Sequence, residues 1–297
     1  MNTPPLNTAQ LNDRVRTVAR MHQTSEARVR RMLAAMIISQ MLPSGVAVKG
    51  GMGIKLRMGE AGTRATADLD VFSADRSDLL TEDFATRLRE GWGSVPASKG
   101  AKKKNPEAPD RVAFTGSLKR FPVHDPGLEK PQYLMHPFKV TLEFLGKPWS
   151  SLDVEVADPE VGEAASHSRT VDAELIELNG HFGFGDLQPV LLIDLEFQIA
   201  QKIHALTFLG DERPQDLVDL QLLWSAGPNV SKLRTYCERT FAFRRAQSWP
   251  PVPLRPMDGW EDRYRLARDE TVVDGQSPVL EEIGAARDWL TGKISEI

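Results

Sequence analysis

The sequence of 297 residues contains almost no cysteine and no long apolar run. Its one cysteine, Cys237, excludes both a disulfide scaffold and a cysteine-rich zinc module. No apolar run approaches the roughly 18 residues that a membrane-spanning helix needs, and the polar segment 1–10 has no apolar signal-peptide core. These absences predict a cytoplasmic protein that has no membrane partner.

The chain also lacks a strong excess of charge of either sign. Its 41 acidic and 37 basic residues give a net charge of −4 with neutral histidines. This balance argues against nucleic-acid binding over the whole surface, but not against a local basic patch. The most basic stretch is 99–120, where seven basic residues against two acidic ones give a local net charge of +5. It falls in a segment rich in Gly and Pro, 91–137, that we expect to be irregular.

Three consecutive lysines within this stretch, Lys102, Lys103 and Lys104, are a candidate contact for the phosphate backbone of RNA. A run of this kind is also typical of a solvated loop, and that alternative stays open. The next candidates are three arginines of the second predicted helix: Arg28, Arg30 and Arg31.

Apolar periodicity predicts an α+β half followed by a helical half, with a loose boundary near residue 190. The expected domains are therefore 1–190, which opens with two helices, and 191–297. The predicted strands are 46–48, 67–72, 138–145 and 152–156, and a helix capped by Thr81 is expected after the second of them. A short strand and a glycine-rich turn are expected within 171–186, and helices from Asp194 onward.

The most informative pattern is a short strand, the pair Gly50–Gly51, a helix and then a strand that carries Asp68 and Asp70. Carboxylates at positions i and i+2 of a strand point to one face, where their mutual repulsion favours a bound cation. Mg²⁺ is commonly bound by one or two carboxylates plus substrate phosphates. The glycines allow close approach of the backbone to phosphate oxygens, and a helix that starts there offers free amide groups. The pattern predicts a nucleoside triphosphate over Mg²⁺, although each half alone is more often a solvated strand face or a turn.

Three segments in this order resemble a known family. Val48–Gly51 followed by Arg64–Asp70 resembles the first motif of polymerase-β-like nucleotidyltransferases, and most of all that of the AbiEii/AbiGii branch, which includes the MenT toxins. Leu195–Leu206 is similar to that branch's helix with its Glu, its Ala-x-Lys and its Ala-Leu ending. Gln215–Leu220 is similar to its Arg-Asp-x-x-Asp-Leu motif. The resemblance implies an α+β fold, in which a nucleotidyltransferase lobe with a mixed sheet precedes a C-terminal helical lobe.

The resemblance also implies roles for individual residues at a site between the two lobes. Asp68 and Asp70 would hold Mg²⁺, and Gly50 and Gly51 would cradle the triphosphate. Lys202 would contact the nucleotide phosphates, where an ammonium neutralises charge on the leaving pyrophosphate.

Further acidic residues belong to the same implied site. Asp216 would complete the last motif, with Asp219 as its less certain second member. Glu155 falls where a third strand carboxylate is expected to join the metal ligands, and Asp153 is its rival on the same face.

The implied activity is Mg²⁺-dependent transfer of a nucleoside monophosphate from a triphosphate to an RNA hydroxyl, with the 3′ end of tRNA as the expected acceptor. The chain would then be a toxin that blocks translation and has an antitoxin partner. Two departures leave alternatives open, because Met52 stands where Ser or Thr usually follows the glycines, and Gln215 replaces an arginine, with Arg213 two residues earlier. The alternatives are a protein side chain as acceptor and a regulatory module that binds nucleotide without turnover.

Overall fold

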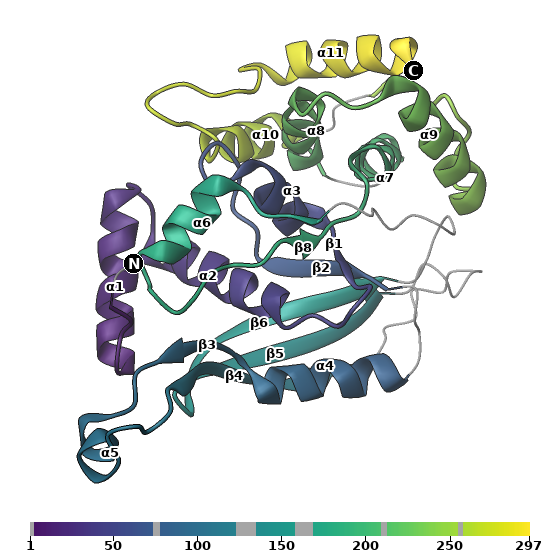
Figure 1. The fold of residues 1–297 in the computed structure, drawn as a ribbon. Coiled ribbons are helices and arrows are strands. Elements are labelled where there is room, and N and C mark those ends of the chain that lie inside the picture. Colours follow the sequence, from purple (N-terminus) through teal and green to yellow (C-terminus); the bar gives the residue numbers. More distant parts are fainter. Residues whose placement is uncertain (1–2, 74–77, 123–134, 158–168, 209–212, 255–257) are drawn as a thin grey trace.

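A six-stranded mixed sheet forms the centre of the first half of the chain (Figure 1). The structure, a computed structural model, describes residues 3–73, 78–122, 135–157, 169–208, 213–254 and 258–297. The strand order is β1-β2-β6-β5-β4-β3, and β2 and β6 are its parallel pair. The strands are β1 (Ala47–Val48), β2 (Asp68–Phe72), β3 (Trp92–Val95), β4 (Arg111–Arg120), β5 (Met135–Phe144) and β6 (Lys147–Ala157).

Alternating apolar side chains of the long strands face the helices that cover the sheet. Leu152 and Val154 of β6 are buried, as are Val140 and Leu142 of β5, because every second residue of a strand points to the same side. The helices of this half are α1 (Thr8–Met21), α2 (Glu26–Gln40), α3 (Gly50–Met58), α4 (Asp78–Glu90), α5 (Lys99–Lys104) and α6 (Ala173–Gly180).

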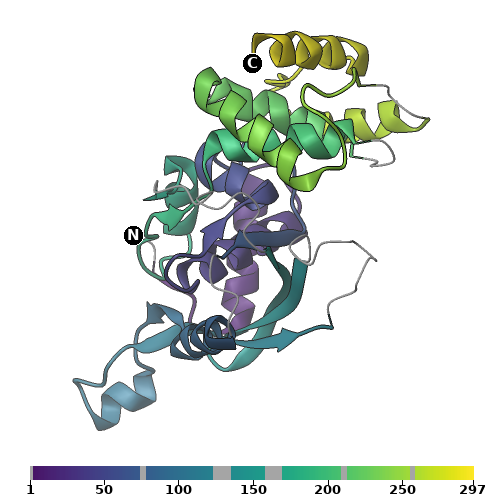
Figure 2. The ribbon, with the colours of Figure 1, turned by 90° about the vertical axis from the view of Figure 1, so that its right-hand side faces the viewer.

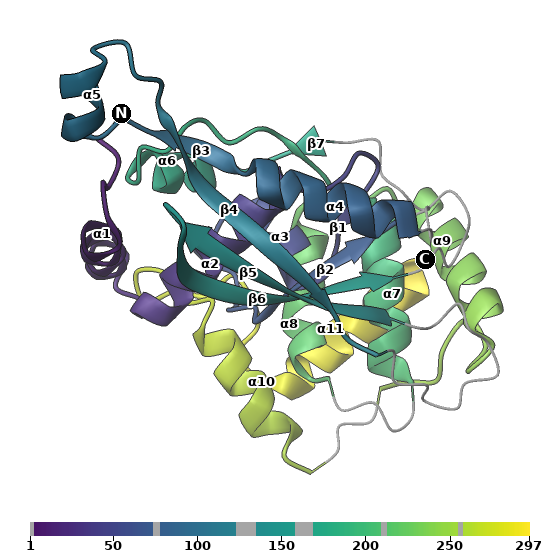
Figure 3. The ribbon, with the colours of Figure 1, turned by 90° about the horizontal axis from the view of Figure 1, so that it is seen from below.

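Helix α2 is the central helix of this half and packs against β6 (Figure 3). It begins where Ser25 accepts a hydrogen bond from the Arg28 amide, an N-cap of the kind its sequence predicts. Nearly every residue from Met32 to Ser39 is buried, which follows from its position between the sheet and α1. The two opening helices predicted from periodicity are therefore confirmed.

The second half is helical and has its own apolar core. It consists of α7 (Leu195–Thr207), α8 (Gln215–Ser225), α9 (Val230–Arg244), α10 (Trp260–Asp269) and α11 (Ile283–Glu296). The last buried residue of one hydrophobic cluster is Leu192, and most buried residues of a second cluster lie between Ile193 and the C-terminal residue. The division into domains near residue 190 stays a prediction. Three residues of the first half join the second cluster at the seam: Ala47, Ile54 and Phe72.

The prediction of an irregular segment at 91–137 is wrong for its described part. That part contains β3, α5, β4 and the start of β5. The sequence pattern does not reveal β4 because only Ala113 and Phe114 of this strand are buried, so no apolar alternation marks it. Backbone pairing with β5, from Phe114 opposite Phe144 to Arg120 opposite Phe138, forms the strand instead.

Two smaller expectations also need correction. Helix α4 begins at Asp78, so Thr81 lies inside the helix and does not cap it. The short strand near 171 is β7 (Arg169–Thr170), which pairs with β8 (Val190–Leu191), and most of the expected turn is helix α6, capped by Asp172. Within the described ranges, no helix is both long and apolar enough to span a membrane.

Candidate functional site

The two aspartates of β2 lie beside acidic residues of β6 on the same face of the sheet. Asp68 is in register with Asp153, and Asp70 is in register with Glu155. Burial, and then the charges of Asp70 and Asp68, raise the pKa of the Glu155 carboxyl above its usual value. The side chain of Asp153 is 65% exposed and pairs with Lys139 at 3.4 Å. Glu155 is therefore the β6 carboxylate that shares the electrostatic environment of the aspartate pair.

The glycine pair lies directly against Asp70. Gly50 has a φ of +61°, and a Cβ atom there would lie 2.0 Å from Asp70 Oδ2. The Lys49 amide donates to the Asp70 carbonyl at 2.9 Å, and Gln198 Nε2 donates to the Gly50 carbonyl at 2.8 Å. A Cβ atom on Gly51 would lie 2.8 Å from Thr66 Oγ1. Both positions therefore need glycine, because the backbone that begins α3 touches the aspartate strand and the segment before it.

The Asp70 carboxyl is buried on this face, and nearby positive charges compensate its burial only in part. Burial raises the pKa of the Asp70 carboxyl, and Asp68 adds to the effect, although Lys49, Lys202 and Arg213 oppose it. A divalent cation would relieve this desolvation and repulsion, and carboxylate oxygens are the ligands that Mg²⁺ takes in proteins.

The residues present therefore fit a divalent cation whose coordination is only partly supplied by protein. No three acidic, histidine or cysteine side chains in the described part of the chain are gathered into a metal-binding group. Two carboxylates with the remaining positions left to water and substrate phosphates is the arrangement that Mg²⁺ commonly takes.

Lys202 of α7 is held by the two aspartates of α8. Its Nζ atom lies 2.7 Å from Asp216 Oδ1 and 2.7 Å from Asp219 Oδ2. Burial alone would lower the pKa of this ammonium, but the two carboxylates outweigh burial and raise it, so the lysine is charged. Lys202 donates hydrogen bonds to both aspartates of α8. Its positive charge also opposes the rise in the pKa of Asp70.

Arg64 completes this ion cluster from the segment that precedes β2. Its Nε and Nη2 atoms donate to the two carboxylate oxygens of Asp219, each at 2.8 Å. Burial opposes ionisation of Asp219, but Lys202 and Arg64 outweigh it and lower the pKa of Asp219 to about 2. The cluster of Arg64, Lys202, Asp216 and Asp219 thus joins the first half of the chain to the helical half.

Several residues at the site were given no role from the sequence. Arg64 lies inside the segment that resembles the family motif, and Lys49 is next to Gly50. Their position in or beside a motif is the sequence feature that could have identified them as site residues. Gln198 precedes Lys202 by four residues and therefore lies on the same side of α7. Thr66 has no such signal, because only the folded chain places its hydroxyl against Gly51.

The two departures from the motif have different surroundings. The side chain of Met52 is fully buried in the core of the first half, so this position does not face the carboxylates. The charge of Arg213 opposes the rise in the pKa of both Asp70 and Glu155. An arginine two residues before Gln215 therefore places positive charge near the site.

The lysine run is not brought to this site. Lys102, Lys103 and Lys104 form the exposed last turn of α5. Figures 1 and 2 show α5 at the far end of the first half, away from the helical half.

The arginines of α2 differ among themselves. Arg28 pairs with Glu60, Arg30 bonds to Asn12, and Arg31 is exposed. Arg28 and Arg30 are thus committed to contacts within the fold.

Comparison with known proteins shows that the chain is similar to nucleotidyltransferases. The family model described as "Nucleotidyl transferase AbiEii toxin, Type IV TA system" matches residues 31–290. No curated protein sequence matches the chain. The structure is similar to MenT4, a nucleotidyltransferase toxin from Mycobacterium tuberculosis H37Rv, with a TM-score of 0.54 and 16% identity over 98% of this chain and 89% of that chain.

A second solved structure is more distant. It is described as a candidate nucleotidyltransferase from H. pylori, with a TM-score of 0.40 and 14% identity over 92% of this chain and 98% of that chain. The likeness to MenT4 shows the fold, and it confirms the expected α+β architecture with a mixed sheet followed by helices.

We predict that Gly50→Ala destabilises the protein more than Gly146→Ala. Both glycines have positive φ, so alanine costs about 1–2 kcal/mol of conformational strain at either position. Only at Gly50 would the new methyl group also collide with Asp70, which adds about 1–3 kcal/mol, whereas nothing lies within 4 Å at Gly146. Urea unfolding measures both, and equal losses would contradict the close packing of Gly50 on Asp70.

We also predict that Asp219→Asn costs about 3–5 kcal/mol of unfolding free energy at pH 7, because it leaves buried Lys202 and Arg64 undercompensated. The folded-state pKa of about 2 is lower than the ordinary value. The contribution is therefore fully present above about pH 4 and is lost as pH falls toward 2.

Exposed Asp153 provides the matched control, since its ion pair with Lys139 is a surface one. Asp153→Asn should cost less than about 1 kcal/mol at any pH in this range. A loss of similar size for the two variants would contradict the importance of the buried cluster.

Proposed function

The chain belongs to the AbiEii nucleotidyltransferase toxin family of type IV toxin–antitoxin systems, and from that premise we propose that it transfers a nucleoside monophosphate to the 3′ end of an RNA. The nucleotide donor is a nucleoside triphosphate with Mg²⁺, and the acceptor is tRNA. The observation that carries this proposal is the contact between Gly50 and Asp70, beside Asp68 and Glu155 on one sheet face.

Asp68 and Asp70 are the residues that would hold the metal, with Glu155 as a third carboxylate on the same face. Bound there, Mg²⁺ would neutralise phosphate charge and orient the triphosphate for in-line displacement. The start of α3 at Gly50 presents backbone amides toward the same place, which favours a bound anion.

The chain's own cations serve the departing phosphates. In the transfer, the acceptor hydroxyl oxygen bonds to the α-phosphorus and its proton passes to solvent water. The bond from the α-phosphorus to the oxygen that bridges to the β-phosphorus breaks, and pyrophosphate leaves with that electron pair. Lys49, Lys202 and Arg213 each place positive charge near Asp70. They are the residues positioned to stabilise negative charge as pyrophosphate forms.

Asp216 and Asp219 also have a role in this proposal, because both bind the ammonium of Lys202. These aspartates act as positioning residues that keep a buried lysine charged where its charge acts on Asp70. Thr66 supplies a hydroxyl beside Gly51, in the place where buried Met52 cannot.

The choice of RNA and of the tRNA 3′ end rests on the resemblance to the MenT branch. A toxin of this family is paired with an antitoxin, which is the expected protein partner. The position of the charge of Arg213 and the burial of Met52 both favour turnover over a module that only binds nucleotide.

The test is incubation with each of the four α-labelled nucleoside triphosphates and Mg²⁺, with either total RNA or lysate protein as acceptor. We expect label on RNA of tRNA size, removable by digestion from the 3′ end. Label on protein would replace the RNA acceptor by a side chain, and nucleotide binding without label would replace transfer by regulation.

Asp70→Asn should abolish this transfer. It should not lower the melting temperature in the absence of metal, because it removes a carboxylate that burial and Asp68 destabilise. Circular dichroism and the labelling assay measure the two effects. A variant that retains full transfer would contradict the assignment of Asp70.

A further inference from the structure

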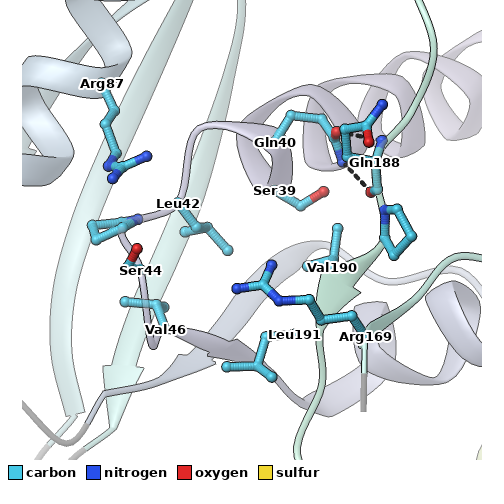
Figure 4. Close-up of a pocket in the computed structure, with 12 residues that line it drawn as sticks. Ser39, Gln40, Leu42, Ser44, Val46, Arg87, Arg169, Gln188, Val190 and Leu191 are labelled. Carbon is cyan, nitrogen blue, oxygen red and sulfur yellow. Dashed lines mark hydrogen bonds between the residues drawn. The ribbon is translucent and has the colours of Figure 1, made fainter. Parts of the chain in front are cut away.

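Away from the aspartates of β2, a polar pocket lies on the first half of the chain, between the end of α2, helix α4 and the β7–β8 pair (Figure 4). Its volume is about 160 Å³, and because one water needs roughly 10–15 Å³ of such space, a phosphate group fits with part of its hydration. The residues that matter to its chemistry are Ser44, Arg87 and Arg169 with the paired Gln40 and Gln188.

Two arginines from separate elements reach into this pocket. Figure 4 shows Arg87 of α4 and Arg169 of β7 extending from opposite sides toward the same space. Arg87 uses its Nε atom for Asp83 at 3.0 Å, and this surface pair is 39% and 46% exposed. The guanidinium of Arg169 forms no ion pair with the described residues.

Among the described residues that line the pocket, none is acidic. An anion in this pocket would interact favourably with both guanidinium groups, because both line the same space. Their planar donor groups match the oxygens of a phosphate.

The rim of the pocket is fixed by hydrogen bonds. Gln40 Nε2 donates to the Gln188 carbonyl at 3.1 Å, and the Gln188 amide donates to Gln40 Oε1 at 2.8 Å. These two bonds tie the end of α2 to the segment before β8. The hydroxyl of exposed Ser44 adds a donor at the edge.

We infer that this pocket, called here the arginine pocket, binds a backbone phosphate of the acceptor RNA. The inference rests on the proposed function and names a site for its acceptor. Val46 lines the pocket, and β1 leads from there to Gly50. Four residues span at most about 14 Å, so the pocket lies within a few nucleotides of the bond that forms.

The arginine pocket is a better acceptor site than the lysine run for two reasons. Lys102, Lys103 and Lys104 lie at the far end of the first half, whereas β1 connects the pocket directly to the candidate site. The lysines are also exposed on α5, and none of them lines the arginine pocket. A single phosphate is therefore held more specifically between the two arginines.

The test compares the full-length wild type with Arg87→Ala/Arg169→Ala in binding a tRNA, at salt concentrations from 50 to 200 mM. Loss of one phosphate contact lowers the slope of log affinity against log salt by about 0.7–0.9. This change corresponds to binding that is about tenfold weaker at 50 mM and about fourfold weaker at 200 mM. The transfer assay should show a higher KM for tRNA and an unchanged KM for the nucleotide.

Three control variants make the result specific. Arg89→Ala removes an exposed arginine from another face of the same helix and should leave the salt slope unchanged. The triple variant Lys102→Ala/Lys103→Ala/Lys104→Ala should weaken RNA binding less than the double arginine variant. Arg87→Lys/Arg169→Lys should keep the slope but bind more weakly than the wild type, because ammonium groups lack the planar fork.

Polyglutamate serves as a competing polyanion, and we expect it to bind the wild type more weakly than tRNA does and without dependence on the two arginines. Equal tRNA affinity and slope for the double arginine variant and Arg89→Ala would overturn the inference. So would an equal loss of polyglutamate binding, which would make the pocket a general anion site. If the double arginine variant binds tRNA like the wild type while transfer to RNA continues, the RNA-binding role of the pocket is wrong and the proposed function stands. If the wild type binds tRNA through the two arginines but labels none, the proposed function fails instead.

Discussion

The ammonium of Lys202 is buried between the carboxylates of Asp216 and Asp219, and one of these aspartates also anchors the first half of the chain through Arg64. A buried charge is tolerated only when it is paired, so α7 and α8 must hold these three side chains together. Arg64 extends the constraint across the seam by binding Asp219 with two nitrogens. The segment that leads into β2 is therefore fixed against the helical half.

This constraint determines where the acidic face of the sheet lies. Arg64 precedes Asp68 by four residues, so anchoring it positions the start of β2 and with it Asp70. On the other side, Gln198 of α7 binds the Gly50 carbonyl at 2.8 Å. Helix α7 thus supports both the glycine turn and the cluster that holds β2, and the close contact of Gly50 with Asp70 follows from the two attachments.

The sequence was sufficient for those parts of the fold and site that carry a local signal. Alternation predicted β2 and β6, and the spacing of Asp68 and Asp70 predicted a shared face. It was insufficient where partners come from distant segments. Strand β4 exists through its pairing with β5, and it was missed because it has almost no buried alternation. The link from Arg64 to Asp219 spans 155 positions, and no local pattern reveals it.

The departures from the motif at Gln215 and Met52 also show that a local pattern does not reveal which groups lie near the site. In the sequence alone, Met52 stands in place of a hydroxyl side chain and Gln215 in place of an arginine of the motif. In the folded chain the charge of Arg213 reaches Asp70, and Thr66 places a hydroxyl beside Gly51. The folded chain thus has a positive charge and a hydroxyl group close to the two positions where the sequence departs from the motif.

The central claim is that the β2 aspartates bind a metal and a nucleoside triphosphate together. The most direct measurement is the melting temperature of wild type and Asp70→Asn with Mg²⁺ alone, nucleotide alone and both. A ligand at 100 times its dissociation constant adds about 2.7 kcal/mol, which corresponds to about 5 °C for a chain of this size. We expect that increase only for the wild type with both ligands present. Equal increases in the two proteins, or an increase with nucleotide that ignores Mg²⁺, would contradict the account.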